Sequence, residues 1–143
     1  MVRISEISIE PCNGQEIKFI SDGLNEFNLS QVPPLAPNWT SFDFVAKTKE
    51  GVEIGGILGG IGYWNGLEIR ALWVHEKYRG KGLGSRILAY IETLARKKGA
   101  VIAMLDTFDF QAEKFYLKNG YQPIGEIKDF PMGHRRIYFS KRL

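Results

Sequence analysis

The sequence has little cysteine, little histidine and no long hydrophobic run. Cys12 is the only cysteine among 143 residues, so no disulfide bond can form within the chain. No apolar stretch approaches the roughly 20 residues that cross a bilayer, and no basic segment followed by an apolar one opens the chain. These absences predict a soluble, cytoplasmic protein with no membrane partner.

Metal and nucleic-acid sites also lack sequence support. The two histidines, His75 and His134, have no metal-ligand spacing with Cys12, so we expect no metal. The net charge of +3 is a mild excess that suits an anionic small ligand as well as it suits nucleic acid. The basic pairs at 135–136 and 141–142 are typical of a solvated edge, and no interleaved aromatic platform for RNA is evident, so we expect no nucleic-acid partner. Nucleic-acid binding remains an alternative that salt-dependent DNA binding would support.

What the chain does contain is enough apolar sequence for one core. Hydrophobic residues make up 44% of the composition and aromatic residues 13%, and no polar low-complexity tract interrupts them. A chain of this length buries about two-thirds of its unfolded surface. The sequence therefore predicts a single domain over residues 1–143.

Hydrophobic spacing predicts an alternation of strands and helices typical of a mixed α/β fold. The expected strands are 2–9, 42–46, 54–61, 67–74, 101–105, 121–127 and 136–139, and the expected helices are 17–27, 83–95 and 110–119. The continuous apolar run Val101–Leu105 predicts a buried strand with a parallel neighbour. The five glycines between 55 and 62 indicate either a bulged strand or a close approach to a ligand.

The strand at 67–74 shows strict alternation. It predicts one face formed by Leu67, Ile69, Ala71 and Trp73, and an opposite face formed by Glu68, Arg70, Leu72 and Val74. A strand, helix and strand from 67 to 105 require a right-handed crossover. This topology places the turn after Val74 at the carboxyl end of its strand, where ligands gather in α/β sheets.

That turn is rich in glycine and opens the helix expected at 83–95. Gly80, Gly82 and Gly84 allow a ligand to approach backbone N–H groups that have no partner inside the helix. Arg79 and Lys81 add positive charge, so the turn predicts a phosphate site. The spacing is neither that of a Walker loop nor the G-x-G-x-x-G of dinucleotide sites.

Two motifs together resemble the GNAT superfamily of N-acetyltransferases. The turn R-x-x-G-x-G at 79–84 is similar to the loop that binds the acyl-CoA pyrophosphate in that family. The segment from Ala112 to Tyr121 resembles the family's late pattern A-x-x-F/L-Y-x-x-x-G-F/Y, and the motifs follow the family order. The resemblance implies a mixed central sheet of six to seven strands flanked by helices. Splayed parallel strands would form the acyl-CoA cleft.

The resemblance also implies acetyl-CoA as cosubstrate and assigns roles to residues. The residues implied to bind it are Leu72, Trp73, Val74, Arg79, Gly80, Lys81, Gly82, Leu83, Gly84, Ser85 and Asp109. Many family members have Asn where this chain has Asp109, which could instead cap the following helix. Tyr116 matches the family's tyrosine, where a phenol with a pKa of about 10 could protonate the leaving thiolate. Glu68 is the expected base, acting through water, although a solvated or paired glutamate is an alternative.

The implied function is transfer of an acetyl group from acetyl-CoA to a primary amine of a small molecule. An acyl-CoA-binding module without turnover and a protein N-acetyltransferase are alternatives of the same fold. The aromatic residues Trp39, Phe42, Tyr63, Trp64, Phe108 and Phe130 could line an acceptor pocket or belong to the core. The family resemblance is compatible with a homodimer, but no sequence feature marks an interface.

Overall fold

A computed structural model describes all 143 residues, which divide into two compact units, Met1–Pro34 and Leu35–Leu143. The first unit contains a short 3-10 turn, η1 (Ile4–Glu6), and one long helix, α1 (Gly14–Gln31). Asn13 caps α1 by accepting a hydrogen bond from the backbone N–H of Glu16. No other residue of this unit covers the apolar side chains of α1 at 17, 20, 24 and 27.

The prediction of a strand at residues 2–9 is wrong. The segment contains η1, and no strand pairs with it. Its apolar residues Val2, Ile4, Ile7 and Ile9 are exposed. Alternation of apolar residues predicts a strand only where a neighbouring strand supplies backbone partners, and this segment has none.

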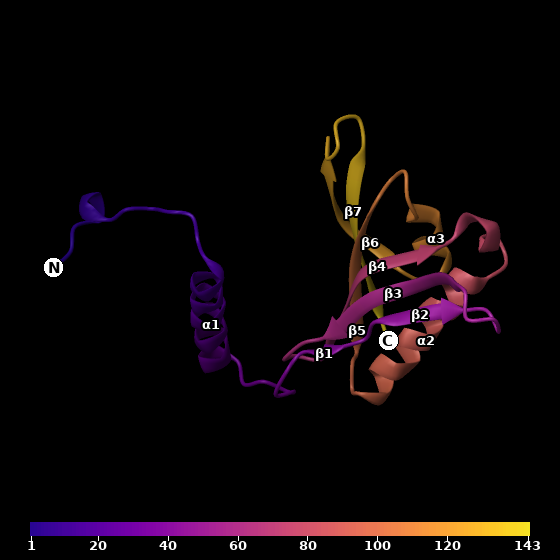
Figure 1. Cartoon of the computed structure of the whole chain (residues 1–143), viewed down its shortest axis with the longest axis horizontal. Helices are drawn as coiled ribbons and strands as arrows, with labels where there is room; N and C mark the ends of the chain where they lie inside the picture. Colours follow the sequence, from indigo (N-terminus) through magenta and orange to yellow (C-terminus); the bar gives the residue numbers. More distant parts are fainter. The chain divides into compact units, whose positions relative to one another are not determined.

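The second unit is a seven-stranded mixed sheet with two helices (Figure 1). Its elements are β1 (Thr40–Ser41), β2 (Phe44–Lys47), β3 (Glu53–Ile61), β4 (Gly66–Val74), η2 (Glu76–Tyr78), α2 (Leu83–Lys97), β5 (Ile102–Phe108), α3 (Glu113–Lys118), β6 (Gln122–Lys128) and β7 (Arg135–Arg142). The strand order is β1-β3-β4-β5-β7-β6, with β2 also pairing with β3. The parallel pair is β4 and β5, and all other pairs are antiparallel. This arrangement confirms the mixed α/β fold class.

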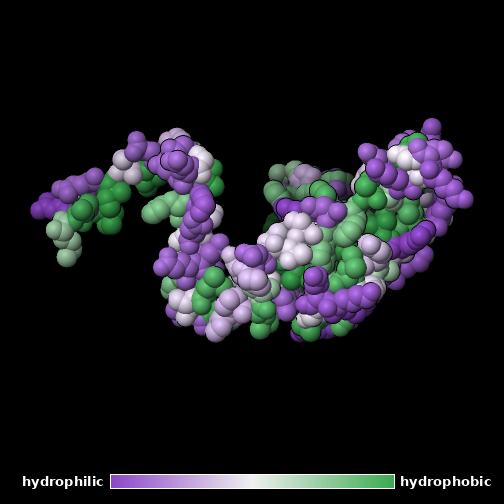
Figure 2. Space-filling view, turned by 60° about the horizontal axis from the view of Figure 1, so that its bottom comes forward, coloured by the Kyte–Doolittle hydropathy of each residue, from purple (hydrophilic) through white to green (hydrophobic).

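One face of the sheet packs against α2 and α3 to form the core. Leu67, Ala103 and Phe139 from the sheet are almost completely buried, as are Leu88 and Ile91 from α2. The end of α2 matches its prediction, because Lys98 is the C-cap and Gly99 follows at φ +92°. None of the helices combines the length and the apolar character that a membrane-spanning helix needs. Figure 2 shows that apolar side chains also reach the surface of the molecule between polar ones.

A bulge in the pairing of β3 with β4 changes which side chains of β4 face the core. Leu58 pairs with Ala71 but Gly59 pairs with Ile69, so β4 contains one extra residue. Leu67 and Ile69 face the core before the bulge, and Leu72 and Val74 pack against the core after it. The prediction that Glu68 lies on the same face of the strand as Leu72 and Val74 is therefore wrong.

The glycines of β3 serve close packing of the backbone. A Cβ atom on Gly60 would overlap the indole ring of Trp39, and one on Gly56 would lie 2.6 Å from the carbonyl oxygen of Phe44. These contacts favour the bulged-strand interpretation of the glycine run over a ligand contact.

Candidate active site

The parallel strands β4 and β5 separate along their length. Their pairing runs from Gly66 opposite Ile102 to Glu68 opposite Met104 and then stops. Beyond this point β4 continues to Val74 without a strand partner on its β5 side. The separation opens a cleft of about 1010 Å³, which is large for a small-molecule site.

A second boundary of the cleft is the glycine turn that begins α2. Gly80 and Gly82 have φ values of +75° and +84°, a left-handed conformation that favours glycine. Gly82 is the N-cap of α2 and supplies no side-chain cap to the first helical N–H groups. No atom lies within 4 Å of a Cβ built on either glycine, so a ligand can approach the backbone. The start of α2 is therefore an open anion site.

Arg79 and Lys81, the two cations of the turn, lie in different positions relative to the cleft. The Nε atom of Arg79 donates a hydrogen bond of 2.7 Å to the carbonyl oxygen of Val74, which ties the turn to the end of β4. Lys81 lies with its ammonium 5.9 Å from the ring centre of Tyr78 and is not among the residues that line the cleft. Arg79 thus lies in the wall of the cleft, whereas Lys81 lies outside the cleft lining.

Most residues assigned to the cofactor from the sequence do line this cleft. They are Leu72, Trp73, Val74, Arg79, Gly80, Gly82, Leu83, Gly84, Ser85 and Asp109. The residues of β4 lie on one wall, the glycine turn closes one end, and Asp109 follows β5 on the other wall. One continuous cavity therefore joins the two sequence motifs.

Tyr116 lies on α3 and also lines the cleft. The residue is 5% exposed, and its ring contacts the rings of Tyr121 and Phe139 at centroid distances of 5.8 and 6.0 Å. Its hydroxyl has no hydrogen bond within the protein, and no buried polar side-chain atom lacks a partner, so the hydroxyl reaches the solvent of the cleft. Burial, and then the negative charge of Asp106, raise the pKa of Tyr116 to about 12. The phenol is therefore fully protonated at neutral pH.

Glu68 occupies a different position from the one that strict alternation implies. It lies where β4 is still paired with β5, opposite Met104, and its side chain is exposed. It is not among the residues that line the cleft. Because the bulge follows Glu68, its side chain lies on the sheet face opposite to that of Leu72 and Val74.

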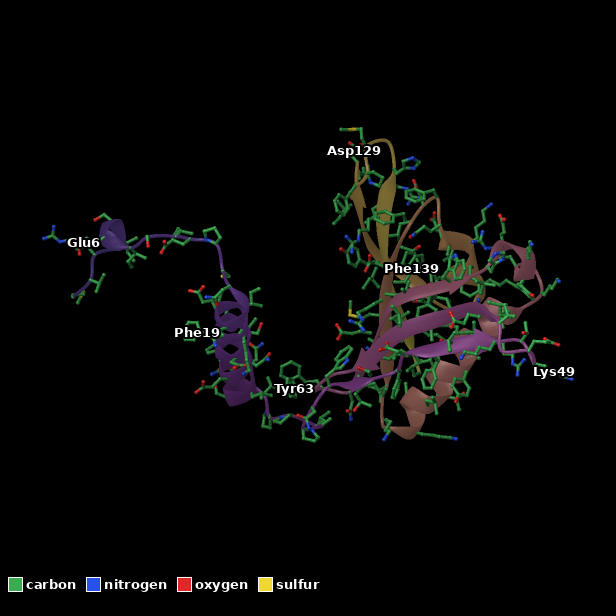
Figure 3. The ribbon with its side chains drawn as sticks, viewed as in Figure 1. Glu6, Phe19, Lys49, Tyr63, Asp129 and Phe139 are labelled. Atoms are coloured by element: carbon green, nitrogen blue, oxygen red, sulfur yellow. The ribbon has the colours of Figure 1, made fainter.

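Asp109 joins β5 to the hairpin formed by β6 and β7. Its Oδ2 atom accepts a hydrogen bond of 3.1 Å from the backbone N–H of Arg135, and its Oδ1 atom lies 2.9 Å from Nδ1 of His134. Ala112 is the N-cap of α3, so Asp109 does not cap that helix. Figure 3 shows the hairpin, with Asp129 at its tip and Phe139 at its base.

Sequence reasoning did not assign Asp106 to the site. Asp106 lines the cleft at the carboxyl end of β5 and makes a 2.6 Å ion pair with Nε of Arg136 on β7. Asp106 directly follows the apolar run at 101–105, and this position could have indicated a site residue, because ligands bind beyond the carboxyl ends of parallel strands. The partner, 30 residues later in the chain, becomes visible only with the register of β5 and β7.

Comparison with protein families gives a match over most of the larger unit. The model described as the acetyltransferase (GNAT) domain matches residues 41–123. The blasticidin-S acetyltransferase of Streptomyces morookaense is 40% identical over 86 residues, which cover 59% of this chain and 62% of that protein. The chain thus matches less than two-thirds of the length of that relative.

Solved structures resemble the chain over greater lengths. An acetyltransferase from Bacillus cereus ATCC 14579 has a TM-score of 0.90 at 35% identity, covering 98% of this chain and 100% of that one. A candidate streptothricin acetyltransferase from Bacillus anthracis str. Ames, in complex with acetyl coenzyme A, has a TM-score of 0.65 at 25% identity. That similarity covers 76% of this chain and 65% of the other.

Proposed function

The chain belongs to the acetyltransferase (GNAT) family, and we propose that it transfers an acetyl group from acetyl-CoA to a primary amine of a small molecule. The observation that carries this proposal is a single cleft that joins an open helix start, an unpaired strand edge and the hydroxyl of Tyr116. The three features match the three parts of a thioester cosubstrate: an anionic pyrophosphate, an amide-containing arm and a sulfur atom.

The residues of the cleft fit acetyl-CoA. The N–H groups at the start of α2, together with Arg79, would hold the pyrophosphate. The free edge of β4 at Leu72, Trp73 and Val74 would pair with the amides of the pantetheine arm, as one strand pairs with another. An N–H group of this edge would stabilise the negative charge that develops on the thioester oxygen.

The reaction requires two proton movements. The amine nitrogen attacks the carbonyl carbon of the thioester, the bond between carbon and sulfur breaks, the amine loses a proton and the thiolate gains one. We assign the second proton to Tyr116, whose phenol is protonated and faces the cleft. Glu68 stays the proposed base only through a chain of water molecules, since its exposed side chain lies outside the cleft lining and cannot reach the amine directly.

Acetyl-CoA binding and turnover test the proposal separately. Acetyl-CoA at 100 times its Kd should stabilise the folded protein by about 2.7 kcal/mol, which a thermal-unfolding scan would detect. An amine library should then show thiol release that depends on protein and on amine. Thermal protection without thiol release would favour a CoA-binding module instead. Acetylation of peptides but not of small amines would favour a protein acceptor.

A further inference from the structure

A cluster of charged and aromatic side chains lies beside the cleft on the sheet face opposite α2. The register of β5 and β7 places Asp106 opposite Tyr138 and Phe108 opposite Arg136. Directly opposite residues in an antiparallel pair point to the same face. The four side chains therefore form one patch, and Phe130 from the hairpin joins it.

Arg136 is held in place without using all its donors. Its Nε atom donates to Oδ2 of Asp106 at 2.6 Å, and its guanidinium carbon lies 5.4 to 5.7 Å from the ring centres of Phe108, Phe130 and Tyr138. Its two terminal nitrogen atoms have no hydrogen bond to any protein acceptor, and 30% of its side chain is exposed. A fixed guanidinium with two free nitrogen atoms is suited to binding a carboxylate through paired hydrogen bonds.

Asp106 offers the complementary charge on the cleft side. Its Oδ1 atom has no donor within the protein, and the residue lines the cleft together with Tyr116. Asp106 and Tyr116 line the same cleft, and we place the thioester sulfur beside the Tyr116 phenol. An acceptor amine must come close to the same position in order to attack the thioester.

We propose that the acceptor carries a carboxylate as well as the reacting amine, as a free amino acid does. Arg136 binds the carboxylate through its terminal nitrogen atoms, and Asp106 accepts a hydrogen bond from the amine. Arg136 and Asp106 thereby complement the carboxylate and the amine of an acceptor in which these two groups lie close together. A polyamine fits less well, because its second ammonium group would lie against the guanidinium of Arg136. This inference rests on the proposed acetyl transfer.

The test compares free amino acids with their primary amides as acceptors, at saturating acetyl-CoA, by thiol release. The amides retain the amine but lack the negative charge, so the intact protein should show a kcat/KM about 10- to 100-fold higher for the acids. R136Q should reduce kcat/KM for the acids by a similar factor, mainly through KM, and should reduce it much less for the amides. R142Q is the matched control, because Arg142 is an exposed residue at the far end of the same strand. It should change neither rate.

Two further variants separate recognition from folding. R136K keeps the charge but loses the fork of donors, so it should restore part of the preference for acids. D106N removes the proposed amine partner and should lower kcat for acids and amides alike. Acetylation of amides and acids at equal rates, or equal losses of both in R136Q, would overturn the inference and leave acetyl transfer standing. Binding of acetyl-CoA with no acetylation of any amine would overturn both.

Discussion

Tyr116 is the residue on which the proposed chemistry depends most. Its hydroxyl faces the cleft, and burial together with Asp106 raises its pKa to about 12, above the ordinary value that sequence reasoning assumed. A higher pKa keeps the phenol protonated over the whole neutral range, which a proton donor requires. The identity of the residue could be predicted from its motif, whereas its pKa depends on neighbours that only the fold brings together.

Replacement of Tyr116 by Phe removes the proposed acid and leaves the ring packing intact. We expect kcat to fall by about 10²- to 10⁴-fold, with acetyl-CoA affinity retained, because general acid catalysis contributes a factor of this size. Tyr90→Phe is the control, since Tyr90 lies exposed on α2 and contacts Phe44 away from the cleft. An unchanged kcat in Tyr116→Phe would reject the assignment.

The raised pKa of Tyr116 also predicts how stability depends on pH. Between pH 10 and pH 12 the unfolded chain loses the phenolic proton while the folded chain retains it, so the free energy of unfolding falls as pH rises. The full fall for a shift of this size is about 2.7 kcal/mol, with no effect below pH 9. Burial and Glu92 raise the pKa of Tyr121 as well, which adds to the fall. Urea unfolding from pH 9 to 11.5 should show a smaller decline in Tyr116→Phe than in the parent, and equal declines would contradict the burial of this phenol.

At the scale of the elements, α2 joins the glycine turn to the core. Its limits and its apolar stripe were predictable, because spacing, the Lys97–Lys98 pair and Gly99 are local signals. The reversal of faces in β4 was not predictable, because it results from a bulge of one extra residue, and the pairing of β4 with β3 determines where that bulge lies. The pairing of Asp106 with Arg136 escaped prediction for the same reason, since it depends on cross-strand register.

The glycine turn should tolerate little substitution. Ala at Gly82 must adopt a φ of +84°, so we expect a loss of about 1 to 2 kcal/mol in stability. The added Cβ would also stand where the ligand approaches, which should weaken acetyl-CoA binding. Gly23→Ala is the matched control, because Gly23 lies within α1 with no atom near its Cβ position. Titration of acetyl-CoA into both variants measures the effect, and equal affinities would argue against this turn as the pyrophosphate site.

A buried ion pair fastens α2 to β7. Glu92 is 4% exposed, lies 3.0 Å from Nζ of Lys141 and accepts a 2.8 Å hydrogen bond from the hydroxyl of Tyr121. Glu92→Ala leaves the charge of Lys141 without its partner, so unfolding should become about 3 to 5 kcal/mol easier. Glu50→Ala, in an exposed turn, should cost less than about 0.5 kcal/mol. Denaturant unfolding of both variants checks this, and similar losses would show that the pair contributes nothing specific.

At the scale of the whole molecule, the sequence indicated the family and the cleft better than it indicated the acceptor. Two local motifs carry the residues assigned to the cofactor, because backbone N–H groups and a strand edge would recognise acetyl-CoA through short continuous segments. The proposed acceptor side consists of residues from β5, β7 and the hairpin, whose side chains meet only after folding. The strand predicted at 2–9 failed because nothing in the fold pairs with it.

Amine-dependent transfer from acetyl-CoA in the cleft between β4 and β5 can be measured directly. The purified protein is incubated with isotope-labelled acetyl-CoA and an amine library, and the products are identified by mass spectrometry. The proposed function predicts one or more labelled N-acetyl products, with an equal amount of free thiol, both reduced in Tyr116→Phe. Absence of any labelled amine, in a protein that acetyl-CoA does not protect against heat, would contradict it.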